Sequence, residues 1–177
     1  MRLFIAVPLD DEVKNAICET IVSLKTNAHS GNFSSRAALH CVLNLIGEVA
    51  SPDAAIAAMD SITAAPFDIN IGGYGITKRR TGNIHWSTVK APYDELSALR
   101  EAINDALTAN GLRADTAEFK PTFTLGRDVE TISTFNPATF SRTVQTVSQH
   151  VGEIILVKSE VVGGKQTYTT IYTKALG

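Results

Sequence analysis

Several features that define whole classes of protein are scarce in this chain of 177 residues. Its cysteines are Cys18 and Cys41, which lie in a predicted helix and a predicted strand. This pair provides no disulfide framework, so we expect two reduced core thiols and a cytoplasmic protein. No apolar run approaches the roughly 18 residues that a membrane-spanning helix needs, and the apolar start breaks at Pro8 and Asp10, too early for a signal peptide. We therefore expect no membrane association.

Charge is also scarce, with 19% charged residues and a net charge of −2. A chain with this balance has no bulk attraction to nucleic acid, so any RNA binding must depend on local basic residues. The hydrophobic content of 44% argues against disorder. The length predicts one folded domain, residues 1–177, with a substantial core.

Hydrophobic patterns with helical and strand periods alternate along the chain, and three stretches have the pattern of a hairpin. Together they predict an α+β fold with mostly antiparallel sheets. Residues 26–36, rich in Asn, Ser and Gly, predict a polar loop at the rim of a cleft. A helix that starts at Asn136 is expected to carry Phe140, Val144 and Val147. The other predicted elements are strands at 2–7, 39–47, 67–74, 83–90, 119–127, 154–162 and 167–173, and helices that follow Asp10, follow Ser51 and cover 92–110.

Two of the predicted strands, residues 39–47 and 119–127, have the same build. Apolar residues alternate with residues that can face a cleft: His40, Val42 and Asn44 in the first strand, and Thr122 and Thr124 in the second. The two segments lie about 82 residues apart, so we expect equivalent strands of two half-domains rather than the arms of one hairpin.

These segments resemble the motifs of the two-histidine (2H) phosphoesterases, and in particular the bacterial RNA 2′,3′-cyclic phosphodiesterases, also called 2′-5′ RNA ligase-like proteins. That family has a His-x-Thr/Ser-x motif on each of two neighbouring central strands. Here the first motif begins at His40 and is followed by residues 46–49, and the second spans residues 121–127. The resemblance extends over nearly the whole chain and includes its opening residues, the hairpin at 72–86 and the segment at 156–159 with Tyr168. Two positions depart from the family pattern, with Val42 in place of Thr and Thr122 in place of His.

The resemblance implies two pseudo-symmetric lobes with outer helices, whose sheets face each other across a central groove. It implies action without a metal or other cofactor on RNA ends or nucleotides carrying a 2′,3′-cyclic or 2′-phosphate. We also expect a monomer. His40 keeps the first histidine position, Thr124 the second threonine position and Arg127 the arginine that follows it. In such a site, one imidazole takes a proton from water, the other protonates the departing ribose oxygen, and the hydroxyls bind phosphate oxygens.

Because Val42 cannot donate a hydrogen bond and Thr122 cannot exchange a proton near pH 7, we expect impaired activity or binding without turnover. Losing one positioned acid or base typically costs about 10²- to 10⁴-fold in rate. The alternatives are a non-catalytic module that binds nucleotide or RNA, and a groove reassigned to a small anion or a protein partner. A lone strand histidine such as His40 is usually structural, but the surrounding motif favours a place in the cleft.

Other histidines offer weaker candidates for a missing acid or base. His85 and Trp86 must face opposite sides of their strand, so only one of them faces the cleft. We favour a structural histidine at position 85. His150 is explained by the dipole at the end of a predicted helix, and His29 by solvation in the polar loop.

Basic residues supply the candidate phosphate contacts. Arg127 lies three positions after Thr124, so it reaches the cleft only if the strand bends after Gly126; otherwise it forms a surface ion pair with Asp128 or Glu130. Lys78, Arg79 and Arg80 form the tip of a predicted hairpin. They are either a solvated turn or a contact for the RNA backbone.

Overall fold

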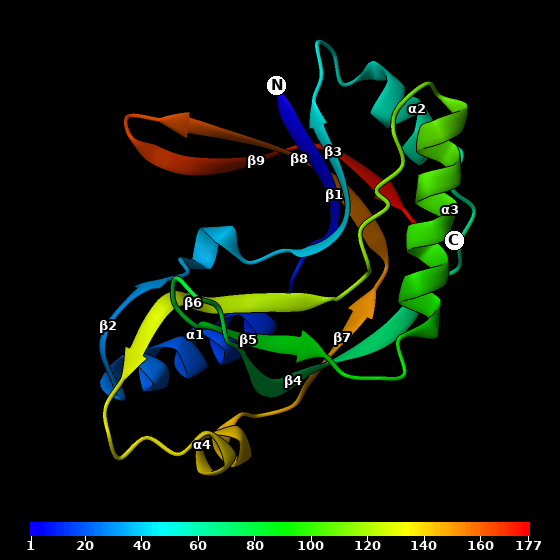
Figure 1. The fold of residues 1–177 in the computed structure, drawn as a ribbon. Helices are drawn as coiled ribbons and strands as arrows, with labels where there is room; N and C mark the ends of the chain where they lie inside the picture. The colour runs from blue at the N-terminus through cyan, green and yellow to red at the C-terminus, as the bar shows by residue number, and fades with distance from the viewer.

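The computed structural model describes residues 1–177 and consists of two antiparallel sheets and four α-helices (Figure 1). The first sheet has the strand order β3-β1-β8-β9 and the second has the order β2-β6-β5-β4-β7. Every strand pair in both sheets is antiparallel, which confirms the predicted α+β class. The strands are β1 (Arg2–Val7), β2 (Ala28–Phe33), β3 (Cys41–Glu48), β4 (Phe67–Thr77), β5 (Ile84–Val89), β6 (Thr122–Thr131), β7 (Val147–Val151), β8 (Glu153–Val162) and β9 (Lys165–Ala175).

Helices cover the outer face of each sheet. The helices α1 (Asp11–Thr26) and α4 (Pro137–Thr143) pack on the five-stranded sheet, whereas α2 (Asp53–Asp60) and α3 (Asp94–Ala109) lie side by side on the four-stranded sheet (Figure 1). A short 3-10 helix, η1 (Arg36–Ala38), connects β2 of one sheet to β3 of the other. Neither lobe is a continuous half of the sequence, because the chain passes back and forth between the two sheets. No helix is long and apolar enough to cross a membrane.

The helix positions follow from their apolar periodicity. In α1, Val13, Ile17, Ile21 and Leu24 are buried, as their spacing predicts. The helix α3 likewise buries Leu96, Leu99, Ile103 and Leu107 and stops before Gly111, whose φ of +78° suits glycine best. These faces join one hydrophobic cluster of 31 buried residues that includes side chains from both sheets. The two lobes therefore share a core.

The central strand β1 is buried on both faces, which explains its lack of polar alternation. Leu3, Ile5 and Val7 enter the main core, whereas Phe4 and Ala6 belong to a small second cluster with Ile155 and Val157. Tyr168 packs against this second cluster. The inner face of the four-stranded sheet is thus apolar at its centre.

Two predicted elements were wrong. Residues 28–33 form the edge strand β2 rather than a loop, because their backbone pairs with β6 in spite of the polar side chains. The helix predicted from Asn136 ends at Thr143, and Val147 begins the strand β7, which pairs with β4. His150 therefore lies on a strand, where its Nδ1 is 2.8 Å from a carboxylate oxygen of Asp68, and not at the end of a helix.

Irregular pairing in β3 changes which side chains reach the inner face. The register against β1 shifts between the pairs Ile5–Asn44 and Ala6–Val42, so one extra residue of β3 lies between them. Such a bulge reverses the alternation of side chains. Asn44 was predicted to face the cleft, but it is fully buried and its Nδ2 donates to Oδ1 of Asn104 in α3 at 2.8 Å. The prediction for Asn44 was therefore wrong.

Candidate functional site

A cavity of about 330 Å³, which we call the inner cavity, lies between the two sheets. It collects most of the predicted site residues, His40, Val42, Thr122, Thr124 and Arg127, although these come from segments about 80 positions apart. Strand β2 contributes part of the wall, as predicted for a cleft rim at residues 26–36. The remaining lining residues are Asn32, Phe33, Ser34, Ala38, Leu39, Phe123 and Tyr168.

His40 immediately precedes β3, and aromatic rings hold it in place. Its ring centroid lies 5.4 Å from that of Phe4, in an edge-on arrangement, and 5.4 Å from that of Tyr168. The side chain is partly buried, and its Nδ1 is inaccessible to solvent without a hydrogen-bond partner. A histidine with a free ring nitrogen at the wall of a cavity can exchange a proton with a bound molecule through its other nitrogen.

Burial among these rings lowers the pKa of His40 below its ordinary value. The backbone of Ala38 raises the pKa, although its geometry to the ring is too poor for a hydrogen bond, and the positive charge of Lys14 lowers it. Desolvation is the largest of these effects, so the imidazole is mainly neutral at pH 7. In this state it can act as a base toward a bound group.

Strand β6 places its polar side chains through a second irregularity. Trp86 pairs with Thr124 and His85 pairs with Gly126, so Leu125 is the extra residue between them. Leu125 and Gly126 are both buried, and the alternation resumes one position later. Thr122, Thr124 and Arg127 therefore face the same cavity, although strict alternation would separate Arg127 from the threonines. Of the two alternatives for Arg127, the structure has the one in which it reaches the cleft without an ion pair, but the irregularity lies at Leu125 and not after Gly126.

A second cavity of about 630 Å³, which we call the outer cavity, shares a wall with the first. Thr122, Thr124 and Arg127 line both cavities, so the two adjoin each other along β6, and we refer to them together as the groove. Trp86 and Thr88 face the outer cavity because they pair across the sheet with Thr124 and Thr122. The other residues that line it are Thr77, Arg79, Ile84, Val89, Ala91, Tyr93, Lys120 and Pro121.

The charges along the groove have one sign. Neither cavity is lined by an aspartate or a glutamate, although the chain has more acidic than basic residues. Arg79, Lys120 and Arg127 supply positive charge, and only Lys120 has an ion-pair partner, Glu118, at 3.3 Å on the exposed surface. Cations without partners, together with hydroxyl donors and no carboxylates, suit the binding of an anion such as phosphate.

The remaining candidates lie outside the groove. Lys78 and Arg80, at the tip of the hairpin, line neither cavity, so of the three basic residues there only Arg79 reaches the groove. His85 is 1% exposed and its Nδ1 lies 2.5 Å from the hydroxyl of Tyr74, on the opposite face of the sheet from Trp86. The expectation of a structural histidine is confirmed.

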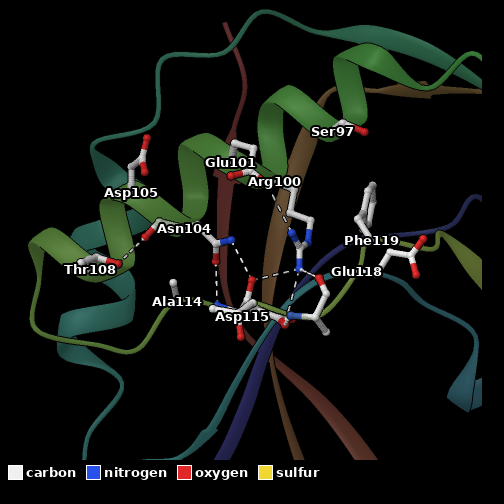
Figure 2. A pocket seen from close by; sticks show the side chains of 12 residues that line it. Ser97, Arg100, Glu101, Asn104, Asp105, Thr108, Ala114, Asp115, Glu118 and Phe119 are labelled. Carbon is white, nitrogen blue, oxygen red and sulfur yellow. Dashed lines mark hydrogen bonds and ion pairs between the residues drawn. The ribbon is translucent and has the colours of Figure 1, made fainter.

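A third cavity, of about 520 Å³, lies beneath α3 and holds none of the predicted residues (Figure 2). In Figure 2, Arg100 and Asn104 reach from the helix to the loop that contains Asp115. Arg100 donates to the backbone oxygens of Leu43, Asp115 and Ala117 at 2.7–3.1 Å. These bonds fix the loop that leads into β6. Four carboxylates line this cavity, those of Glu101, Asp105, Asp115 and Glu118, and Arg100 pairs with Glu101 and Asp115, each at 3.4 Å.

The cysteines offer no reactive group at the groove. Both are free thiols, as expected. Cys41 is 2% exposed, and burial raises the pKa of its thiol to about 12. It therefore stays protonated and is no nucleophile. No group of three or more His, Cys, Asp or Glu side chains is arranged to hold a metal ion.

Sequence reasoning did not assign Tyr168 or Trp86 to the site. Strand parity indicated that either His85 or Trp86 faces the cleft, and the burial of His85 decides in favour of Trp86. Tyr168 pairs with Ser159 near the outer end of the hairpin formed by β8 and β9. Tyr168 was among the positions that carry the family resemblance, but no local pattern in the sequence places β9 beside His40.

The fold of this chain, with its inner cavity between two antiparallel sheets, is shared with several solved structures, among them one of a phosphoesterase at a TM-score of 0.76 and 24% identity, over 99% of this chain and 97% of that one. The chain superposes on E. coli LigT in complex with 3′-AMP with a TM-score of 0.76 and 24% identity, over 99% of this chain and 96% of that one. The Thermus thermophilus protein TT0787 gives a TM-score of 0.73 at 22% identity, over 99% and 98% of the two chains. The PDE domain of MHV ns2 gives a TM-score of 0.60 at 16% identity, over 97% of this chain and 100% of that one.

At these identities the likeness shows a shared fold. No family model and no curated protein matches the sequence. Other solved structures of E. coli LigT, also with this fold, hold NADP⁺, ATP or phosphate. Those ligands are all phosphorylated molecules or phosphate itself.

Proposed function

We propose that this chain binds RNA ends or nucleotides carrying a 2′,3′-cyclic or 2′-phosphate, and that it opens the cyclic phosphate slowly with one imidazole. The observation that carries the proposal is the inner cavity, in which His40 faces Thr122, Thr124 and Arg127 on a wall without carboxylates. The cavity is complete within one chain, so we expect a monomer to act, in the cytoplasm. The nucleotide-bound structures of E. coli LigT add support at the level of the shared fold.

In the proposed reaction, neutral His40 takes a proton from a water molecule as the water attacks phosphorus. The bond from phosphorus to the 3′ oxygen breaks, and the product is a 2′-phosphomonoester. Thr124 donates a hydrogen bond to a phosphoryl oxygen, and the Arg127 guanidinium offsets the negative charge. The departing 3′ oxygen must gain a proton.

The cavity provides no efficient acid to donate this second proton. In-line displacement puts the attacking water and the leaving oxygen on opposite sides of phosphorus, so His40 cannot serve both. Thr122 stands where the second imidazole would be, and its hydroxyl cannot exchange a proton efficiently near pH 7. The leaving oxygen therefore takes its proton from water, and the reaction is slow.

The test is hydrolysis of a nucleoside 2′,3′-cyclic phosphate by the purified protein, with the 2′-phosphomonoester detected by chromatography. We expect slow turnover that disappears in His40→Ala and falls about 10²-fold in Thr124→Val, which removes one hydrogen-bond donor. His29→Ala is the matched control, because that histidine lines neither cavity and its loss should leave the rate unchanged. Turnover no faster than in buffer rules out the catalytic form of the proposal.

The second candidate is a non-catalytic module that binds the same phosphates. It is favoured by Val42, which is 37% exposed in the cavity wall. Its apolar side chain stands where the family pattern has a hydroxyl that donates a hydrogen bond to phosphate. Binding would then depend on charge, weaken with salt and persist in His40→Ala. The double variant Arg127→Ala, Arg79→Ala should lose most of the affinity. Unchanged affinity would contradict this candidate.

A further inference from the structure

The outer cavity has features of a binding site that the chemistry at the inner cavity does not use. At about 630 Å³ it is nearly twice the volume of the inner cavity, and both volumes fall in the range of small-ligand sites. The two share the wall formed by Thr122, Thr124 and Arg127. A molecule whose phosphate occupies the inner cavity can therefore place its neighbouring groups in the outer one.

Trp86 forms a fixed aromatic surface in the outer cavity. Its Nε1 donates to Oγ1 of Thr77 at 3.1 Å, and its ring lies so close over Gly75 that no Cβ fits at that position. The residue is still partly exposed and lines the cavity. A ring that is held before the ligand arrives loses little freedom on binding, and every nucleobase has a flat face that can stack on it.

The charges of the outer cavity suit a polyanion. Arg79, Lys120 and Arg127 line it with no acidic residue, and Arg79 and Arg127 form no ion pair in the protein. The cavity beneath α3 differs, because four carboxylates line it and its arginine already pairs with two of them and donates to backbone oxygens. Of these two large cavities, only the one with Trp86 would attract RNA.

We propose that the outer cavity binds the 5′ flank of a single-stranded RNA whose 3′-terminal phosphate occupies the inner cavity. One nucleobase stacks on Trp86, and the next phosphate toward the 5′ end binds Arg79. This inference rests on the proposed function and adds to it a preference for RNA over single nucleotides. Stacking carries no sequence readout, so the preference is independent of the base.

The experiment uses the intrinsic fluorescence of the native protein, because Trp86 is its sole tryptophan. The probes are adenosine 2′,3′-cyclic phosphate, a dinucleotide that ends in a 2′,3′-cyclic phosphate, and glycerol 1,2-cyclic phosphate, which lacks a base. We expect the first two to quench the emission and the third to leave it unchanged. We also expect the dinucleotide to bind about tenfold more tightly than the mononucleotide, since it adds one charge-assisted phosphate contact.

The variants are compared by calorimetry. Trp86→Ala should weaken binding of both nucleotides about tenfold and leave glycerol cyclic phosphate unaffected, whereas Trp86→Phe should keep most of the affinity. Arg79→Ala should remove the advantage of the dinucleotide. Arg80→Ala is the matched control, because that arginine is the next residue and lines neither cavity, and it should keep the advantage.

The outcomes separate this inference from the function on which it rests. Binding of cyclic phosphates that depends on Arg127 but is unchanged in Trp86→Ala and Arg79→Ala would overturn the RNA flank site and leave the proposed function standing. If the dinucleotide binds through Trp86 and Arg79 equally well with a 3′-hydroxyl end, the flank site stands and recognition of the cyclic phosphate fails. No quenching by the dinucleotide, with the cavity intact, overturns the inference.

Discussion

At the scale of single residues, Val42 and Thr122 limit the chemistry of the inner cavity. Both belong to exposed positions on the cavity wall, so new side chains there displace no core residue. The double variant Val42→Thr, Thr122→His would supply a second imidazole and a second hydroxyl. We expect cyclic phosphodiesterase activity to rise by about 10²- to 10⁴-fold. Product formation from a nucleoside 2′,3′-cyclic phosphate measures it, with each single variant as the comparison.

The pH dependence of the reaction rate also tests the role of His40 as the base. Because burial lowers the pKa of His40, its basic form is already dominant at neutral pH. The rate at saturating substrate should therefore rise from pH 5 through the His40 pKa and then stay level above pH 7. A falling limb at higher pH should arise only in Thr122→His, where a second imidazole must stay protonated. A falling limb near neutral pH in the unaltered protein would contradict the assignment of a single imidazole.

At the scale of elements, the pairing of β4 with β5 depends on the close contact of Trp86 with its cross-strand partner Gly75. A Cβ at position 75 would collide with the indole ring, so Gly75→Ala should lower the free energy of unfolding by about 1–3 kcal/mol. The control is Gly152→Ala, whose Cβ would meet only the ring of His150 at an ordinary 3.5 Å. Urea denaturation measures both, and a shift in tryptophan emission in the first variant alone would report the displaced ring.

The loop before β6 depends on Arg100 in the same way. This side chain is 6% exposed, and it is bonded to three backbone oxygens and paired with Asp115 at 3.4 Å. Arg100→Met keeps much of the volume but leaves those oxygens without a donor, and we expect a loss of about 2–4 kcal/mol in unfolding free energy. Glu101→Gln removes only an exposed partner and should change stability by less than about 1 kcal/mol. Equal effects of the two variants would contradict this role.

At the scale of the whole molecule, the shared core predicts a single cooperative unfolding transition whose stability depends on pH. Burial lowers the pKa of His85 in the folded state, so the unfolded chain takes up the proton first as the pH falls. Stability should therefore be level above pH 7 and should decline below about pH 6.5, until the folded-state pKa is passed. Burial lowers the pKa of His40 in the same direction, so His85→Gln should remove part of this decline and His85→Gln with His40→Gln should remove more, and an unchanged slope in urea denaturation would contradict it.

Local sequence signals predicted most of the elements because each depends on neighbours in the chain. The apolar spacing in α1 and α3, and the hairpins at Gly163 and at residues 78–82, match the structure closely. Two errors occurred where distant pairing overrides local preference. The strand β2 has polar side chains, but its backbone pairs with β6. The helix before β7 was expected to include Val144 and Val147, but it ends at Thr143, and Val147 pairs with β4 instead.

The sequence by itself determined the residue types at the candidate site, because the motif positions of His40, Val42, Thr122 and Thr124 stand in order along the chain. It also predicted two strands for them, and three of the four lie on those strands, while His40 immediately precedes β3. Only the tertiary structure decided which side chains share the groove. Bulges in β3 and β6 shift the alternation by one position, which sends Asn44 into the core and turns Arg127 toward the threonines. Pairing between distant strands sets those bulges, and no local pattern contains that information.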